Sequence, residues 1–282
     1  MKLVTLSEVL QPAESSGYAV GAFNFCNAET VQAVVEEGCS QRSPLILIVG
    51  PWEIPLLGVR TLTTLAEMAA ADANVPVCLH LDHATEFDQV KECVDAGFPS
   101  VMIDASQKDF EENVRLTRSV VEMAHAKGVT VEGELGAVGR VGDTDVEGSQ
   151  GSSLTDPGRA AEFVERTGVD ALASSIGNAH GMYKQLPELD FGRLQAIRDS
   201  VGVPLVLHGG SGTPDDQLQR AIGIGVCKVN VATEIALAYL AAIQAGIDRQ
   251  AWYAHALIDA KSAARQVVQR WIIKLGSAGR IA

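Results

Sequence analysis

Eight short apolar runs recur along the chain, and each is followed by a turn and then by a segment with apolar residues at helical spacing. A short continuous apolar run between turn signals is typical of a strand that is buried on both faces. Strands that alternate with helices predict βαβ units and a parallel sheet. We therefore expect strands at 19–24, 45–49, 77–82, 100–105, 130–135, 171–176, 204–209 and 226–231.

Helix start and stop signals lie between these runs. Thr85 is the candidate N-cap of a helix that ends at Gly97. Asp156 directly precedes Pro157, and this pair predicts the start of a second helix, which ends at Gly168. These signals support the reading of the intervening segments as helices.

The number of strands favours an α/β fold, a (β/α)8 TIM barrel with extra C-terminal helices. An open, doubly wound sheet is the alternative. No shift in composition marks a boundary, so we expect one domain over 1–282. Two alanine-rich helices follow the last strand, at 233–246 and roughly 248–275, and make a helical extension from about residue 247. Their apolar faces can cap the barrel or pair with another subunit.

Composition narrows the class of protein. With 47% hydrophobic and 20% charged residues, the chain can bury a large core. Its formal charge of −13 and the lack of a basic stripe argue against nucleic acid as a partner. No apolar run is long enough for a bilayer or for a secretory signal, so we expect a cytoplasmic protein without a membrane partner. Five scattered cysteines without CxxC spacing are expected to be reduced.

Three histidines lie at or just after the ends of separate predicted strands, where barrels of this kind place their chemistry: His83, His180 and His208. Neutral imidazole is the commonest metal ligand, and three imidazoles with an open position are typical of a catalytic zinc site. His80 lies two residues before Asp82, so it shares that side of the strand but sits deeper, and we interpret it as structural.

Carboxylates near the same strand ends suit such a site. Glu132 and Glu134 have the same parity on one strand and therefore point the same way. One can approach a metal while the other holds a histidine, because ligating histidines usually donate their second N–H to a carboxylate. We take Glu134 as a metal ligand, and Asp104 and Glu132 as partners of the histidines. A salt bridge inside the barrel is the alternative for each.

Two glycine- or threonine-containing turns are candidate anion sites. They are "LHGGSG" at 207–212 and "KVNVAT" at 228–233, and both precede predicted helices. Backbone N–H groups and helix N-termini bind anions, and the loops after strands seven and eight often bind phosphate in this fold. An anionic substrate would therefore be held by local groups in spite of the acidic chain.

The motifs "LHLDHATEFD", "SVMIDAS", "VEGELG", "AHGMYK", "LVLHGGSG" and "KVNVATE" together resemble those of the class II, metal-dependent fructose- and tagatose-bisphosphate aldolases. The resemblance runs from about residue 3 to residue 280, and "AHGMY" is closest to the tagatose-type branch. It implies a zinc-dependent lyase that cleaves tagatose 1,6-bisphosphate or fructose 1,6-bisphosphate to dihydroxyacetone phosphate and an aldehyde such as glyceraldehyde 3-phosphate.

The resemblance also implies roles for individual residues. The three histidines would hold Zn²⁺, and Asp82 would move the proton of the C4 hydroxyl. Gly181 and Gly209 would border a monovalent cation, Na⁺ or K⁺. Such enzymes are homodimers or homotetramers, and Arg265 or Arg280 is the candidate for reaching a second phosphate. With the strand-end residues added, the substrate-binding set is Asn24, Gly181, Lys184, Gly209, Gly210, Ser211, Asn230 and Thr233.

The loop after the fifth strand departs from the family pattern. Family members carry acidic residues there, one of which moves the carbon-bound proton, whereas this chain has Arg140, Val141 and Gly142. Asp143, Asp145 or Glu147 can substitute in so glycine-rich a loop. We take Asp82, Asn230 and Asp143 as the candidate catalytic residues.

Three alternatives remain open at this point. Lys228 can point into the barrel and form a Schiff base with a ketose, which would make a metal-free aldolase. The altered loop is also compatible with a related ketose-phosphate aldolase or epimerase that has a different substrate. A barrel used only for binding is the third alternative.

Overall fold

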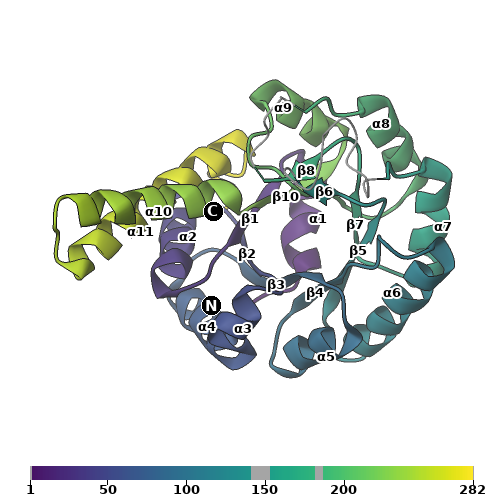
Figure 1. Ribbon diagram of the computed structural model, residues 1–282. Coiled ribbons are helices and arrows are strands. Elements are labelled where there is room, and N and C mark those ends of the chain that lie inside the picture. Colours follow the sequence, from purple (N-terminus) through teal and green to yellow (C-terminus); the bar gives the residue numbers. More distant parts are fainter. Residues whose placement is uncertain (1, 141–152, 182–186, 282) are drawn as a thin grey trace.

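The computed structural model describes residues 2–140, 153–181 and 187–281. Eight parallel strands close into a barrel, in which β1 pairs with both β2 and β10 (Figure 1). This closure confirms the predicted TIM barrel and excludes the open sheet. The barrel strands are β1 (Val20–Asn24), β2 (Leu45–Val49), β3 (Val77–Ala84), β4 (Ser100–Ile103), β5 (Thr130–Leu135), β7 (Ala171–Ser174), β9 (Leu205–Leu207) and β10 (Val226–Val231).

Amphipathic helices cover the outside of the barrel, and their apolar faces share one buried cluster with the outward-facing strand residues. A separate two-stranded sheet pairs β6 (Gly139–Arg140) with β8 (Ala179–His180). The covering helices are α2 (Ala28–Gln41), α3 (Glu53–Leu57), α4 (Val59–Asp72), α5 (Phe87–Asp95), α6 (Phe110–His125), α7 (Pro157–Thr167), α8 (Phe191–Ser200) and α9 (Asp215–Ile224).

The predicted start of the helix at Asp156 is confirmed, and the predicted start of the helix at Thr85 is wrong. The Asp156 side chain accepts hydrogen bonds from two backbone N–H groups of the first turn of α7, and Gly168 ends that helix at a left-handed φ of 75°. The N-cap expected at Thr85 is wrong, because the chain stays extended through Glu86 and α5 begins only at Phe87. A polar residue after a strand does not itself fix where the backbone turns.

Helix α1 (Leu6–Ser16) was not predicted, and it lies across the N-terminal end of the barrel (Figure 1). Thr5 and Glu8 form a capping box at its start. Its buried residues pack against inward-facing apolar residues such as Ala22 and Ile46. One end of the cylinder is therefore closed by side chains. The buried residues of α1 are Leu6, Val9, Leu10 and Ala13.

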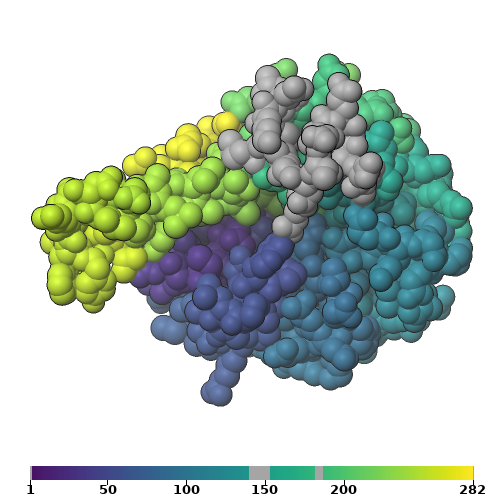
Figure 2. Space-filling view, in the orientation of Figure 1, coloured from purple at the N-terminus to yellow at the C-terminus, as the bar shows by residue number. Residues whose placement is uncertain are grey.

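The two predicted C-terminal helices are confirmed as α10 (Thr233–Asp248) and α11 (Tyr253–Lys274). The two helices pack on each other, α11 also packs on α2, and their connected ends project from the barrel (Figures 1 and 2). Along α10 only Ile235 and Gly246 are buried, while Leu237, Leu240 and Ile247 are exposed. Among the helices that the structure describes, none is long and apolar enough to cross a membrane.

Candidate active site

A backbone irregularity in β3 brings Asp82 and His83 to the same cavity. Successive residues of a regular strand point to opposite faces, so only one of the two should face inward. The pairing of β3 with β4 shifts register between Leu81 and Ala84, and His83 has a left-handed φ of 50°. This bulge turns both side chains toward the cavity at the C-terminal end of the barrel.

The three predicted histidines converge above the barrel. His83 comes from β3, His208 directly follows β9, and His180 lies in β8. The ring centroid of His83 is 4.6 Å from that of His180 and 4.5 Å from that of His208. Each ring offers a nitrogen, and these three atoms lie within 4.8 Å of one another. Residues 97 and 28 positions apart in the chain thus form one group that could hold a metal ion.

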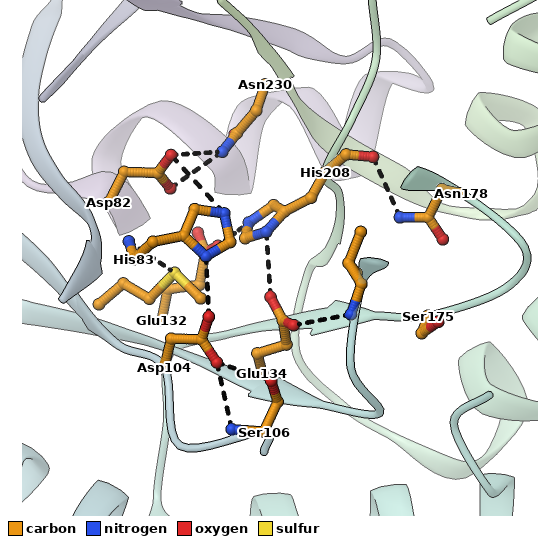
Figure 3. A network of polar contacts seen from close by, with 12 residues as sticks. Asp82, His83, Asp104, Ser106, Glu132, Glu134, Ser175, Asn178, His208 and Asn230 are labelled. Atoms are coloured by element: carbon orange, nitrogen blue, oxygen red, sulfur yellow. Dashed lines mark hydrogen bonds and ion pairs between the residues drawn. The ribbon is translucent and has the colours of Figure 1, made fainter. Parts of the chain in front are cut away.

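Carboxylates fix the orientation of two of the rings (Figure 3). His83 Nδ1 and Asp104 Oδ2 are 2.9 Å apart, and Asp104 Oδ1 accepts hydrogen bonds from the N–H and hydroxyl of Ser106. Burial raises the pKa of Asp104, but the hydrogen bonds from His83 and Ser106 outweigh it, so the pKa is lowered. His208 Nε2 lies 2.8 Å from Glu132 Oε1. These two contacts use only one nitrogen of each ring and leave His83 Nε2 and His208 Nδ1 at the centre of the group.

Three buried atoms at that centre make no well-formed hydrogen bond to the described residues: His83 Nε2, and the pair His208 Nδ1 and Glu134 Oε2, which face each other as an ion pair. Leaving buried polar atoms unpaired costs about 1–3 kcal/mol each, so such a cluster calls for a ligand. Nitrogen and carboxylate oxygen are the atoms that zinc binds in proteins. The donor set fits a divalent cation, and Glu134 Oε2 lies only 3.1 Å from His208 Nδ1.

The electrostatic field at this point favours positive charge. Burial lowers the pKa of His208, but hydrogen bonds and charges of Glu132 and Glu134 reverse that effect and raise the pKa to about 10. The same two carboxylates would stabilise a divalent cation bound beside the ring.

A buried polar column lies below the histidines. Lys228 donates a hydrogen bond of 2.8 Å to Glu132 Oε2, and His80 Nε2 lies 3.7 Å from the same oxygen. His80 Nδ1 is 2.7 Å from the hydroxyl of Ser100. Burial, and the charge of Lys228, lower the pKa of His80 to about 3. His80 therefore lies deeper than Asp82, as predicted, and Lys228 is held in an ion pair instead of facing the cavity.

Asp82 and Asn230 form a second polar pair across the cavity. Asn230 Nδ2 donates to Asp82 Oδ1 at 2.9 Å and to Oδ2 at 3.1 Å. Burial raises the pKa of Asp82, but the charges of His83, Lys228 and His208 together outweigh it and hold the pKa at about 2. The carboxylate is therefore ionised near neutral pH and oriented by the amide, beside the histidine group.

The predicted anion site lies on the wall of the same cavity, which has a volume of about 460 Å³. Gly209, Ser211 and Thr233 line it, and Thr233 opens the first turn of α10. Gly209 has a φ of 64°, and a Cβ there would lie 2.0 Å from the carbonyl oxygen of Ala179. Only glycine fits this close approach, and the helix N-terminus next to it favours an anion.

Other predicted residues reach this cavity, whereas the two predicted arginines do not. Asn24, Gly181 and Asn230 line it, and Gly210 packs behind it against Val229. Whether either arginine reaches a second phosphate, in the homodimer or homotetramer that the resemblance implies, stays a prediction. Arg265 pairs with Glu36 and Glu37 on α2, and Arg280 stacks over Tyr18 at the N-terminal end of β1. Lys184, Asp143, Asp145 and Glu147 lie outside the described residues.

Two residues outside the predicted set of site residues contribute to the site. Asn178 accepts a hydrogen bond from the N–H of Ile176 and donates to the carbonyl of His208, so it ties the loop after β7 to the end of β9. Glu53 lines the cavity just after β2, at a strand end where we predicted nothing. Glu53 lies three positions after Gly50, and its carboxylate accepts a hydrogen bond from the Gly50 N–H. An acidic residue at this spacing after a strand is the sequence signal that could have identified it.

Comparison with known proteins agrees with the geometry. The family model of class II fructose-bisphosphate aldolases matches residues 4–280. The YdjI aldolase from Escherichia coli K12 shares 34% identity and a TM-score of 0.88, over 99% of this chain and 100% of that one. A putative fructose-1,6-bisphosphate aldolase from Coccidioides immitis shares 31% identity and a TM-score of 0.89, over 98% and 97% of the two chains.

A fructose-bisphosphate aldolase from Campylobacter jejuni is more distant, at 22% identity, and its TM-score of 0.85 over 99% of this chain and 97% of that one shows the shared fold. The match of the family model over nearly the whole length, together with a convergent histidine group at the expected strand ends, leads to one conclusion. This chain belongs to the class II fructose-bisphosphate aldolase family and is an aldolase, a lyase.

Proposed function

We propose that this protein is a metal-dependent aldolase that reversibly cleaves the C3–C4 bond of a ketose 1-phosphate or 1,6-bisphosphate. The products would be dihydroxyacetone phosphate and an aldehyde. Tagatose and fructose 1,6-bisphosphates are the substrates expected from the sequence. One observation carries the proposal: buried nitrogen and oxygen atoms that make no well-formed hydrogen bond face one another beside an ionised carboxylate and a glycine-lined cavity wall.

His83, His180 and His208 would hold the metal, with Glu134 as a further ligand. Three imidazoles and a carboxylate suit Zn²⁺, although other divalent ions also accept these ligands. When bound, the cation would supply a Lewis acid that stabilises the negative charge of an enediolate. Asp104 and Glu132 would keep His83 and His208 in the orientation and tautomer that ligation needs.

Asp82 would act as the base in the cleavage direction. It would take the proton of the C4 hydroxyl while the electrons of the C3–C4 bond move to C3, so that C4 becomes the carbonyl carbon of the aldehyde. Asn230 would hold the Asp82 carboxylate in position through its two hydrogen bonds. An acid must then protonate C3 of the enediolate, and Asp143, outside the described residues, is our candidate.

The phosphate on C1 would bind at Gly209, Gly210, Ser211 and Thr233, next to the N-terminus of α10. Gly181 and Gly209 would border a Na⁺ or K⁺ ion. The exposed apolar residues of α10 and of the turn before α11 support a homodimer or homotetramer.

The test is metal analysis of the purified protein, followed by an assay for triose phosphate release from ketose phosphates. We expect one divalent ion per chain, loss of release on treatment with a chelator, and recovery with zinc. Release that survives full metal removal, with covalent trapping by borohydride, would instead support Schiff-base chemistry at Lys228. Conversion of a substrate without triose release would support an epimerase.

A further inference from the structure

We propose that Asn178 is a positioning residue of the metal site. Its side chain fixes the separation of His180 and His208, and so contributes to the affinity for the metal. The inference rests on the proposed function and extends it to a residue that is not itself a ligand. The reason lies in how the backbone carries His180.

His180 is the histidine whose place is set outside the barrel sheet. His83 lies within β3, and His208 directly follows β9, so barrel strands position both. The barrel strand β7 ends at Ser174, six residues before His180. His180 lies instead in β8, which pairs with β6 in the separate two-stranded sheet. Its distance from the other two rings therefore depends on contacts beyond the barrel ladder.

Glycines flank the short segment that carries His180. Gly177 has a φ of 100° and Gly181 a φ of 101°. Glycine adopts such angles without steric cost, but it also leaves the chain more freedom than any other residue. A ligand between two such positions needs further contacts to hold it in one place.

The side chain of Asn178 supplies a contact of this kind. Its Oδ1 accepts a hydrogen bond of 2.9 Å from the N–H of Ile176, which fixes the amide within its own segment. Its Nδ2 donates a hydrogen bond of 3.0 Å to the carbonyl oxygen of His208 (Figure 3). The side chain is 3% exposed, so water has little access to either bond. One amide thus ties the segment of one proposed ligand to the backbone of another.

The backbones of the two ligand segments also touch beside this bond. A Cβ built on Gly209 would lie 2.0 Å from the carbonyl oxygen of Ala179 and 3.1 Å from the backbone nitrogen of His180. Residues 179–180 and 208–209 are therefore in close contact, and a shift of one segment moves its ring relative to the other. Metal sites tolerate deviations of only about 0.2 Å in ligand distance, so small shifts reduce affinity.

A second buried asparagine makes the same bond where the barrel already holds the ligand. Asn113 Nδ2 donates a hydrogen bond of 3.0 Å to the carbonyl oxygen of Glu134, and Asn113 is 2% exposed. Glu134, however, lies inside β5 and is paired with Ala173 of β7. The strand ladder keeps Glu134 in place without Asn113, so the two asparagines should differ in their effect on the metal.

The experiment compares Asn178→Ala with Asn113→Ala in the full-length protein. Competition with a chromogenic chelator gives the dissociation constant for zinc, at a temperature where circular dichroism shows both metal-free variants folded. We expect the dissociation constant to rise by about tenfold in Asn178→Ala and by less than about threefold in Asn113→Ala. Wild-type affinity in Asn178→Ala, or equal losses in the two variants, would overturn the inference.

Replacement of zinc by Co²⁺ reports the arrangement of the ligands without any assay of turnover. The visible absorption of bound Co²⁺ depends on the number and geometry of its ligands. We expect an altered spectrum in Asn178→Ala and the wild-type spectrum in Asn113→Ala. A wild-type spectrum in Asn178→Ala would show that Asn178 does not set the ligand geometry.

Asn178→Ser provides a milder variant in case Asn178→Ala does not fold. The serine hydroxyl can still accept a hydrogen bond from a nearby N–H of its own segment, but it is too short to reach the carbonyl of His208. The dissociation constant for zinc should again rise by about tenfold. Wild-type affinity in this variant would equally overturn the inference.

The wild-type protein separates the failure of this inference from that of the proposed function. A wild-type protein that binds one divalent ion, with unchanged affinity in the Asn178 variants, would overturn the inference alone. A wild-type protein that binds no divalent ion would contradict the proposed function and the inference with it.

Discussion

The two ends of the barrel are built from the same eight strands but from opposite kinds of side chain. At the N-terminal end, α1 covers the opening with Leu6, Val9 and Leu10, each 1% exposed. At the C-terminal end, Asp82, His83 and their neighbours line an open cavity. Along β3 the inward-facing residues change from Cys78 through His80 to Asp82, so one strand passes from an apolar to a charged environment.

The side chains of the closed end contribute mainly to stability, and those of the open end to binding and catalysis. Apolar residues at the closed end gain free energy by leaving water and need no partner. Polar residues at the open end must each find a hydrogen bond, an ion or a substrate, because unpaired burial is costly. Substitutions at the closed end should therefore change stability, and substitutions at the open end should change metal affinity or turnover.

The largest effect is expected from Asp82→Ala at the open end. Turnover should fall by about 10²–10⁴-fold, because the reaction loses its base for the C4 hydroxyl. Metal content should stay at the wild-type level, since the proposed ligands are other residues. Steady-state triose release and metal analysis on the same preparation give the answer. A rate near that of the wild type would remove Asp82 from the mechanism.

The next effect is expected at the closed end. Leu10→Ala should lower the free energy of unfolding by about 2–5 kcal/mol, because it leaves a cavity between α1 and the barrel. Denaturant unfolding measures the change, and Leu56→Ala is the control because Leu56 is 65% exposed on α3. Turnover per folded molecule should be unaltered. A loss of turnover matching that of Asp82→Ala would show that the two ends are not independent.

Asp104→Asn is expected to weaken metal binding at the open end, because Asp104 orients His83. The variant keeps the shape of the side chain but loses the carboxylate that faces His83 Nδ1, so metal affinity should fall by about 10–100-fold. Competition with a chromogenic chelator measures the dissociation constant. Ser106→Ala, which removes one donor to Asp104, should have a smaller effect. Unchanged affinity in Asp104→Asn would show that His83 needs no such support.

The smallest effect is expected from Thr5→Ala, which breaks the capping box of α1. The free energy of unfolding should fall by about 1 kcal/mol, because the N–H of Glu8 loses its acceptor. Ser15→Ala, in an exposed position of the same helix, is the control. Equal effects of the two substitutions would argue against the cap as a source of stability.

The strands and the histidine group could be predicted from the sequence because apolar runs and strand-end polar residues are local signals. Helix α1 was missed even though Thr5 and Glu8 have capping-box spacing, since Pro12 inside the helix reads as a breaker. It is helical here because its apolar face packs on the barrel, and packing is not visible in a local pattern.

Side-chain direction was the harder problem. Strand alternation cannot bring Asp82 and His83 to one cavity, and the bulge that does so has no sequence signature that we could identify. Arg265 and Arg280 were suggested for a second phosphate by the family resemblance alone. Within one chain both lie away from the cavity, and their role at a second phosphate stays a prediction.

The central claim is that His83, His180 and His208 bind one divalent ion at the open end of the barrel. Anomalous diffraction at the zinc absorption edge, from crystals of the zinc-loaded protein, tests it most directly. The account predicts one strong peak per chain, about 2.0–2.1 Å from a nitrogen of each of the three rings. A peak bound by other residues, or no peak among the three rings at saturating zinc, would contradict the account.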